Sequence, residues 1–296
     1  MKKNKFWANK KVLVVGAKGF VGSRLTSALQ ERPCEVRTLS RSRNSVKINK
    51  NTLNKLMSGT DVVINCAAID GNSQFKKDNS ALICNNNVAI VSEILDSAHM
   101  LGVKKVVLLS SADIYSNTAK SPFTENDDFR KFPEYTESGY VLSKIFAEQL
   151  ADQYSKTFGT NILIARPTNI YGVGDKNDRI IPSILSHVKN NSVIPVWGDG
   201  SQKRNFIYIT DFIAILLALI EKDVQGPVNI GSPETATILD IVSIASKIYK
   251  QKPLVSFDLK KQQPNRVLSI RKLKKITDFS FTKLRQGMIE ISNNEN

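Results

Sequence analysis

Short apolar runs alternate with amphipathic stretches over the first half of the chain, and most runs end at a glycine or a polar loop. Each apolar run has the length of one strand that is buried on both faces. The stretches between them carry apolar residues at helical spacing, as Val88, Val91 and Ile94 do. This alternation predicts an α/β fold in which helices cover both faces of a parallel sheet.

The expected elements follow one another in a regular order. Strands are expected at residues 11–15, 35–39, 45–49, 61–68, 105–111 and 161–166. Helices are expected at residues 23–29, 52–57, 87–101 and 139–158. After residue 172, proline and glycine interrupt shorter elements. We therefore expect a Rossmann-type doubly wound parallel sheet over residues 1–171. Residues 172–296 are expected to form mostly a smaller C-terminal substrate lobe, with elements that return to the first domain.

The loop after the first expected strand contains Gly16, Gly19 and Gly22. A strand, a glycine turn and a helix in immediate succession are typical of a dinucleotide-binding fold. One glycine permits the sharp turn, one lets backbone N–H groups approach a pyrophosphate, and one lets helix and strand pack closely. The motif therefore predicts a cofactor loop, with an ordinary glycine-rich turn as the alternative.

The end of the second expected strand indicates which dinucleotide binds. NAD enzymes place an acidic residue there to bind the ribose hydroxyls. This chain has Ser40 and Arg41 at that point, with Arg43 close by. A cation pairs with a 2′-phosphate, so NADP(H) is favoured. NAD(H) stays open if the loop is only a solvated basic segment.

Tyr140 and Lys144 lie four residues apart in the expected helix at 139–158 and share one of its faces. An amine beside a phenol favours the phenolate and lowers the pKa of the phenol. Such a tyrosine can exchange a proton with an alcohol or carbonyl oxygen while a nicotinamide moves hydride at the adjacent carbon. Ser111 ends the preceding strand and can hydrogen-bond the same oxygen. An ordinary exposed helix pair is the alternative for the tyrosine and lysine alone.

Composition and charge narrow the possible partners. The 296 residues carry a formal net charge of +15, which suits a binder of nucleic acid, of a membrane surface or of anionic small molecules. Lysine and arginine are mostly scattered, so we expect a solvated basic surface, with no nucleic acid and no membrane bound. No apolar run is long enough to span a bilayer, and no signal peptide is seen. Cys34, Cys66 and Cys84 lack metal-type spacing, so we expect no metal and reduced thiols in a cytoplasmic protein.

In this order, the motifs resemble the extended short-chain dehydrogenase/reductase family, in its nucleotide-sugar epimerase, dehydratase and reductase branch. The resemblance covers nearly the whole chain, and it implies catalysis by Ser111, Tyr140 and Lys144 on a nucleotide-diphosphate sugar. It also implies a homodimer formed by the helix that bears Tyr140 and the helix before it. With the residues after the second strand, the expected cofactor-binding set is Gly16, Gly19, Phe20, Val21, Gly22, Ser40, Arg41, Ala67, Ala68, Lys144 and Pro167.

The substrate-binding residues that the resemblance implies are Asp113, Asn169, Arg204 and Arg266. Arg204 is expected to contact the substrate diphosphate, with Arg266 as a second candidate, because planar guanidinium groups suit that contact. A surface arginine is the alternative for both, and the stronger one for Arg266. Asp113 either touches the sugar or caps a turn.

Departures from the resembled family narrow the chemistry. Its dehydratases carry an Asp-Glu pair after the serine, where this chain has Ala112 and Asp113, so a 4,6-dehydratase is not expected. The cysteine and histidine that perform 3,5-epimerisation in GDP-fucose synthases are also missing. What remains is redox chemistry at C4 of the sugar, and the leading prediction is an NADP(H)-dependent 4-keto-sugar reductase of surface polysaccharide synthesis. A 4-epimerase with tightly bound NAD and a non-catalytic Rossmann-fold binding or regulatory protein stay as alternatives.

Overall fold

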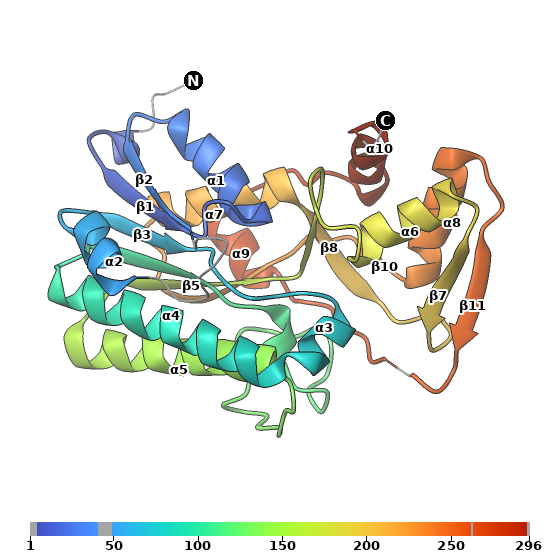
Figure 1. Ribbon diagram of the computed structural model, residues 1–296, viewed down its shortest axis with the longest axis horizontal. Helices are drawn as coiled ribbons and strands as arrows, with labels where there is room; N and C mark the ends of the chain where they lie inside the picture. The colour runs from blue at the N-terminus through green and yellow to red at the C-terminus, as the bar shows by residue number, and fades with distance from the viewer. Residues whose placement is uncertain (1–4, 41–48, 262, 295–296) are drawn as a thin grey trace. The chain divides into compact units, whose positions relative to one another are not determined.

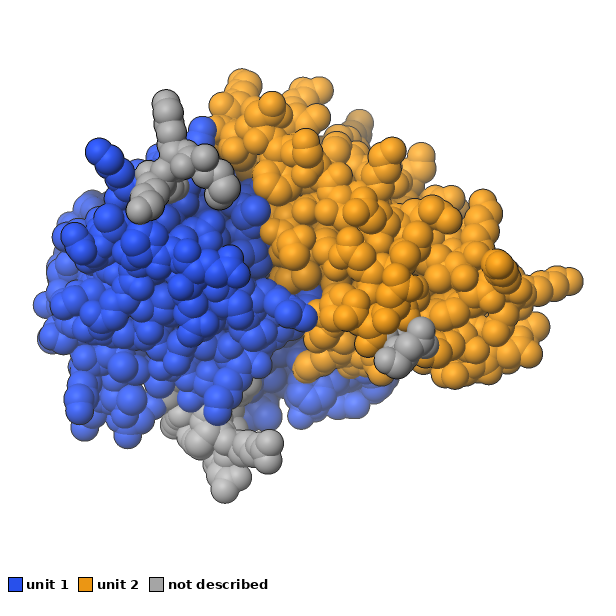
Figure 2. Space-filling model, turned by 90° about the horizontal axis from the view of Figure 1, so that it is seen from above, with its two compact units in different colours: residues 1–114, 133–166, 213–228 blue, residues 115–132, 167–212, 229–296 orange. Residues whose placement is uncertain are grey.

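The computed structural model describes residues 5–40, 49–261 and 263–294. The chain forms two compact units, which Figure 2 colours separately. Unit 1 comprises residues 1–114, 133–166 and 213–228, and unit 2 comprises residues 115–132, 167–212 and 229–296.

The centre of unit 1 is a six-stranded sheet with the order β2-β1-β3-β4-β5-β9. Its strands are β1 (Lys11–Val15), β2 (Glu35–Leu39), β3 (Val62–Asn65), β4 (Lys105–Leu109), β5 (Ile162–Pro167) and β9 (Gly226–Ile230). All pairings among β1 to β5 are parallel. The strand order reverses between β1 and β3, and in such sheets ligands bind outside the carboxyl ends of the strands at this point.

Helices cover both faces of this sheet, with α4 and α5 side by side over one face and α1 over the other (Figure 1). The helical elements are η1 (Lys5–Trp7), α1 (Phe20–Gln30), α2 (Lys50–Met57), α3 (Ser73–Asp78), α4 (Ser80–Met100), η2 (Ala112–Ile114), α5 (Gly139–Phe158) and α7 (Ile209–Glu221). The main core lies between the sheet and α2, α4 and α5, and its aliphatic side chains are almost fully buried. This arrangement confirms the predicted Rossmann-type parallel sheet.

Unit 2 contains two small sheets with their own helices. One sheet has the order β10-β8-β6, and the other pairs β11 with β7 in parallel. The strands are β6 (Asn169–Tyr171), β7 (Val193–Trp197), β8 (Arg204–Tyr208), β10 (Thr235–Ala236) and β11 (Leu254–Asp258). The helices are α6 (Ile180–Lys189), α8 (Ile238–Tyr249), α9 (Arg271–Ile276) and α10 (Leu284–Asn294).

The bounds of individual helices and strands can be compared with those expected from the sequence pattern. The helix expected at 139–158 is confirmed at both ends as α5. The helix expected at 87–101 begins earlier, at Ser80. The apolar stripe did not indicate this start, because the polar but buried Asn86 and Asn87 interrupt it. The strand expected at 45–49 lies almost wholly outside the described residues. In the part of the chain that the structure describes, no helix is long and apolar enough to cross a membrane.

Candidate active site

The loop between β1 and α1 depends on glycine at two positions. Gly16 has φ +85°, and a Cβ atom there would lie 2.6 Å from the backbone nitrogen of Ala67. A Cβ atom on Gly22 would lie 2.2 Å from the carbonyl oxygen of Gly16. Only glycine fits such close approaches of backbone to backbone. The loop therefore brings β1, β3 and the start of α1 into one tight turn.

The start of α1 fits the pyrophosphate of a dinucleotide. Gly19 is the N-cap residue of α1, which begins at Phe20. Because glycine has no side chain, it cannot bind the first N–H groups of the helix, which include those of Phe20 and Val21. Those N–H groups lack intrahelical acceptors and form the positive end of the helix dipole, so they suit an anion. Ala67 and Ala68 follow β3 at the adjacent strand end and are only half-buried.

Ser40 closes the other side of the glycine loop. Its hydroxyl accepts a hydrogen bond from the Lys18 backbone N–H at 3.1 Å, so the end of β2 lies against the loop. A ribose 2′-substituent binds at this strand end in dinucleotide-binding folds. Arg41, the predicted partner of a 2′-phosphate, lies outside the described residues.

Tyr140 is fixed by the way in which α5 begins. Ser138 caps the helix, and its hydroxyl accepts the N–H of Val141. The Gly139 N–H donates to the Ser80 hydroxyl at 2.7 Å, and a Cβ atom on Gly139 would lie 1.9 Å from the Ser80 carbonyl oxygen. The starts of α4 and α5 are thus locked together, and Tyr140 in the first turn of α5 is 8% exposed.

Lys144 lies one turn further along α5 and is 9% exposed. Its ammonium group donates to the carbonyl oxygen of Leu109, at the end of β4, at 2.6 Å. The same nitrogen lies 5.5 Å from the centre of the Tyr140 ring. Burial, together with a smaller effect of Lys76, lowers the pKa of Lys144 to about 8, against an opposing effect of Asp70. A cation of this kind can tune a neighbouring phenol and release a proton close to neutral pH.

Ser111 lies two residues after the end of β4, near the Leu109 carbonyl that binds Lys144. Its hydroxyl oxygen accepts the backbone N–H of Asp113 at 3.1 Å, which closes the turn of η2. Because that bond uses an oxygen lone pair, the hydroxyl proton is left to donate. The carboxylate of Asp113 lies 3.6 Å from the ammonium group of Lys76, and the side chain is 41% exposed.

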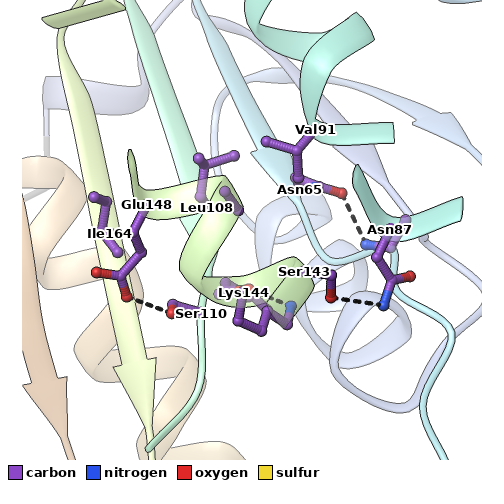
Figure 3. Close-up of a pocket in the computed structure, with 12 residues that line it drawn as sticks. Asn65, Asn87, Val91, Leu108, Ser110, Ser143, Lys144, Glu148 and Ile164 are labelled. Carbon is purple, nitrogen blue, oxygen red and sulfur yellow. Dashed lines mark hydrogen bonds between the residues drawn. The ribbon is translucent and has the colours of Figure 1, made fainter. Parts of the chain in front are cut away.

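Lys144 lines a small pocket of about 10 Å³, close to the volume that one water molecule needs. Figure 3 shows its polar lining. The polar side chains around it are Asn65, Asn87, Ser110, Ser143, Lys144 and Glu148. Asn87 donates to the Ser143 hydroxyl, which in turn donates to the carbonyl oxygen of Tyr140 at 2.7 Å. Hydrogen bonds therefore connect α4 with the two turns of α5 that carry Tyr140 and Lys144.

Ser110, Glu148 and Arg166 form what we call the buried cluster. The Arg166 side chain is fully buried and that of Glu148 is 3% exposed. The guanidinium group donates to both carboxylate oxygens, at 2.9 Å from Nε and 2.5 Å from an Nη atom. The Ser110 hydroxyl donates to the same carboxylate. Glu148 lies one turn after Lys144 on α5, so the cluster joins this part of the helix to the ends of β4 and β5.

Four predicted site residues lie in unit 2. Pro167, predicted to bind the cofactor, ends β5, and Asn169, predicted to bind substrate, opens β6 and donates to the Asn205 carbonyl oxygen at 3.3 Å. The backbones of Arg204 and Arg266 form a β-bridge, so the two arginines lie side by side. The guanidinium group of Arg266 donates to the Tyr115 carbonyl at 3.1 Å and to the Asn117 side chain at 2.9 Å.

Comparison with known proteins identifies the family of the chain. A model of the NAD-dependent epimerase/dehydratase family matches residues 12–231. The chain belongs to this family. It is 34% identical to a dTDP-4-dehydro-6-deoxy-D-allose reductase from a Streptomyces species, over 96% of this chain and 95% of the relative. These matches confirm the predicted family and class, NAD(P)-dependent enzymes of nucleotide-sugar reduction or epimerisation.

Solved structures of the epimerase/dehydratase type share the fold. A GDP-mannoheptose C4 reductase from Campylobacter jejuni with NADP bound superimposes with a TM-score of 0.83 at 20% identity, covering 97% of this chain and 98% of that one. A UDP-glucose 4-epimerase from Thermotoga maritima, solved with UDP-glucose, gives a TM-score of 0.84 at 18% identity, covering 96% and 98%.

Two residues near this site are not among those expected from the sequence. Glu148 continues the spacing of Tyr140 and Lys144 by one further turn of the same helix, and that spacing is the signal that could have indicated it. Lys76 had no local signal, because α3 is short and has no buried residue. Among residues 5–40, 49–261 and 263–294, no group of three or more His, Cys, Asp or Glu residues is placed to hold a metal ion.

Proposed function

We propose that this chain is an NADP(H)-dependent reductase that acts on the C4 carbonyl of a 4-keto nucleotide sugar. The observation that carries the proposal is the pairing of Tyr140 with a buried Lys144 whose pKa is lowered to about 8. A reductase must deliver a proton to the ketone oxygen as hydride reaches the carbon, and this pair supplies an acid tuned for that step. The sequence identity of 34% to a 4-keto-sugar reductase, over 96% of this chain, supports the same reaction.

The residues divide the work at the C4 oxygen. NADP(H), when bound, supplies the hydride. Tyr140 donates its phenolic proton to the C4 oxygen, and the positive charge of Lys144 stabilises the phenolate that remains. The Ser111 hydroxyl donates a hydrogen bond to the same oxygen, since its lone pair is held by the Asp113 N–H. The buried cluster keeps α5 in register with the end of β4, where Ser111 lies.

The substrate class follows from unit 2 and from what the active site omits. The adjacent Arg204 and Arg266 suit the two phosphates of a nucleotide-diphosphate sugar, and Asn169 is a further candidate for a sugar or phosphate contact. Ala112 and Asp113 take the place of the Asp-Glu pair of dehydratases, which leaves no glutamate there for elimination at C5 and C6. We assign the product to surface polysaccharide synthesis in the cytoplasm.

The experiment uses purified protein with dTDP-4-dehydro-6-deoxy-D-allose and a panel of other 4-keto dTDP- and GDP-sugars. NADPH oxidation is followed by absorbance. We expect turnover that falls about 100- to 10,000-fold in Tyr140→Phe, while Tyr154→Phe on the same helix leaves it unchanged. Retained, non-exchanging NAD with interconversion of two nucleotide hexoses would instead identify a 4-epimerase. Undiminished activity in Tyr140→Phe would refute the proposed catalytic role.

Preference for NADP(H) is part of the proposal and has its own test. The cation at Arg41, next to Ser40 at the end of β2, would pair with the 2′-phosphate. Arg41→Asp should lower kcat/KM for NADPH by roughly 10- to 100-fold, the size of a lost hydrogen bond to a charged group. The same variant should gain or retain activity with NADH.

We further propose that the enzyme is a homodimer formed through α4 and α5. Their outer surfaces carry four exposed apolar side chains, Leu82, Met100, Leu142 and Phe158, with exposed fractions of 48%, 72%, 48% and 51%. Leu82 and Leu142 lie near the starts of the two helices and Met100 and Phe158 at their ends, so each end of the helix pair offers two apolar side chains to a contact surface. Sedimentation should give a dimer, and a charged substitution such as Leu142→Glu should shift it towards monomer.

A further inference from the structure

Tyr140 faces two ammonium groups. Lys144 comes from the same helix, whereas Lys76 comes from α3 and places its nitrogen 3.9 Å from the centre of the Tyr140 ring. Lys144 is more distant from that centre, at 5.5 Å. A cation over an aromatic face is attracted by the ring electrons. Deprotonation adds a negative charge that spreads into the same ring, so the attraction is stronger for the phenolate than for the phenol.

Two carboxylates hold Lys76 in this position. Its nitrogen lies 3.0 Å from Asp70 and 3.6 Å from Asp113, and the side chain is 20% exposed. Asp70 follows β3, Asp113 belongs to η2, and α3 itself is capped by Asn72, whose side chain accepts the Phe75 N–H. The lysine is thus fixed from two other segments of unit 1. We call Asp70, Lys76 and Asp113 the tyrosine cluster.

The charges near Tyr140 act in opposite directions. Lys144 on α5 and Lys76 on α3 favour the phenolate, while Asp70 after β3 and Asp113 in η2 oppose it. The same charges act on Lys144, whose pKa is lowered by Lys76 and raised by Asp70, beside the dominant effect of burial. A smaller raising effect comes from the carboxylate of Glu148. Lys76 and Asp70 are therefore close enough to the proton-transfer groups to tune them.

We propose that Lys76 is a positioning residue that stabilises the Tyr140 phenolate from the ring face, as a second cation beside Lys144. The inference rests on the proposed role of Tyr140 as the proton donor. A more stable phenolate makes the tyrosine a stronger acid, which serves the reduction of a ketone. Asp70 sets how far this effect goes, because it neutralises part of the charge of Lys76.

The test titrates Tyr140 directly, with or without turnover. Tyrosinate ultraviolet absorbance is recorded against pH for each protein and for its Tyr140→Phe counterpart, and the difference reports the pKa of Tyr140 alone. Lys76→Met removes the cation and leaves two carboxylates, so this pKa should rise by about one unit or more. Asp70→Asn removes an opposing anion, so the pKa should fall. Lys76→Arg keeps the charge and should restore the original titration.

Lys77 offers a matched control. It is the next residue of α3, it is exposed, and Lys77→Met removes the same charge at similar cost to the helix. Lys77→Met should leave the titration unchanged. A merely structural role of Lys76 would alter folding or activity without moving the pKa of Tyr140 in opposite directions in Lys76→Met and Asp70→Asn.

Kinetics separate this inference from the proposed function. With NADPH and a 4-keto nucleotide sugar that turns over, the pH profile of kcat/KM for Lys76→Met should shift in the same sense as the titration. If Tyr140→Phe abolishes activity but Lys76→Met titrates like the parent protein, the inference fails and the proposed function stands. If Tyr140→Phe retains activity while the titration shifts as expected, the proposed function fails, and Lys76 still stabilises the phenolate.

Discussion

Two charged clusters lie along α5, and they differ in solvent exposure. In the buried cluster, the Glu148 and Arg166 side chains are 3% and 0% exposed and make a bidentate pair. In the tyrosine cluster, Lys76 and Asp70 are 20% and 29% exposed, and the Lys76 nitrogen lies near one oxygen of each of two carboxylates, those of Asp70 and Asp113. The first cluster contacts the framework at β4 and β5, and the second contacts the ring of Tyr140.

The difference in exposure separates positioning from tuning. A buried ion pair adds little net stability, because desolvation offsets attraction, yet it enforces one geometry strongly, since breaking it leaves a charge without water. A half-exposed pair costs little to form or to break and still shifts the pKa of a neighbour. Substitutions in the buried cluster should therefore change folding, whereas those in the tyrosine cluster should change proton transfer.

The largest expected effect on stability is that of Glu148→Ala. The Arg166 guanidinium would remain buried without its carboxylate, and the free energy of unfolding should fall by about 3 to 5 kcal/mol. Denaturant unfolding measures this loss. Asp152→Ala is the control, because Asp152 lies one turn further along α5 and pairs with the exposed Lys156. Equal losses in the two variants would contradict the distinction, and Glu148→Leu with Arg166→Met should recover most of the stability.

Lys144→Met should separate activity from stability. The pKa of Lys144 is about 8 in the fold and 10.5 ordinarily. Below pH 8 the lysine is protonated both folded and unfolded, so the cost of burying its charge is fully present. Between pH 8 and pH 10.5 the lysine is protonated only in the unfolded chain, so the free energy of unfolding increases as pH rises through this range. Relative to Lys144→Met, the gain should reach about 3 kcal/mol.

Unfolding of both proteins across that pH range gives the difference, in which groups common to both cancel. A constant difference would show that Lys144 keeps its ordinary pKa in the fold. Activity of Lys144→Met should be lost at every pH, including those at which it is the more stable protein.

A smaller effect distinguishes two neighbouring serines. Ser110→Ala removes a hydrogen bond to the buried Glu148 carboxylate and should cost about 2 kcal/mol of stability, with activity kept in the folded fraction. Ser111→Ala should do the reverse, since Ser111 is only half-buried and its hydroxyl is proposed to donate to the C4 oxygen. Thermal unfolding and kcat are measured on the same preparations. Parallel losses in both variants would contradict the assignment.

The smallest expected effect is that of Lys76→Met on stability. Half-exposed ion pairs contribute less than about 1 kcal/mol, so the unfolding midpoint should scarcely change. The same variant is expected to change the titration of Tyr140. A large loss of stability would place Lys76 with the framework rather than with the tyrosine.

Local pattern was sufficient where one helix or loop contains all the relevant residues. Tyr140 and Lys144 were predicted because both lie on one face of a helix whose ends the sequence also marks, at Ser138 and Gly159. Pattern failed for the start of α4, because Asn87 is buried there by hydrogen bonds in both directions with the Ile69 backbone, at 2.7 and 3.1 Å. A polar side chain in a helix that hydrogen-bonds the backbone of a buried loop cannot be distinguished from a surface residue by sequence pattern alone.

The sequence alone determined the strand–helix alternation, the glycine loop and the Tyr140–Lys144 pair, because each depends on residues within one or two turns of one another. Only the tertiary structure showed that Lys144 is buried against the carbonyl of Leu109, that Glu148 meets Arg166, and that Lys76 lies over the Tyr140 ring. These contacts join residues from different helices and strands. The burial of each side chain and the charges around it therefore depend on how those elements pack, which the local sequence does not show. The sequence thus indicated which groups could react, and the fold decided the charges that surround them.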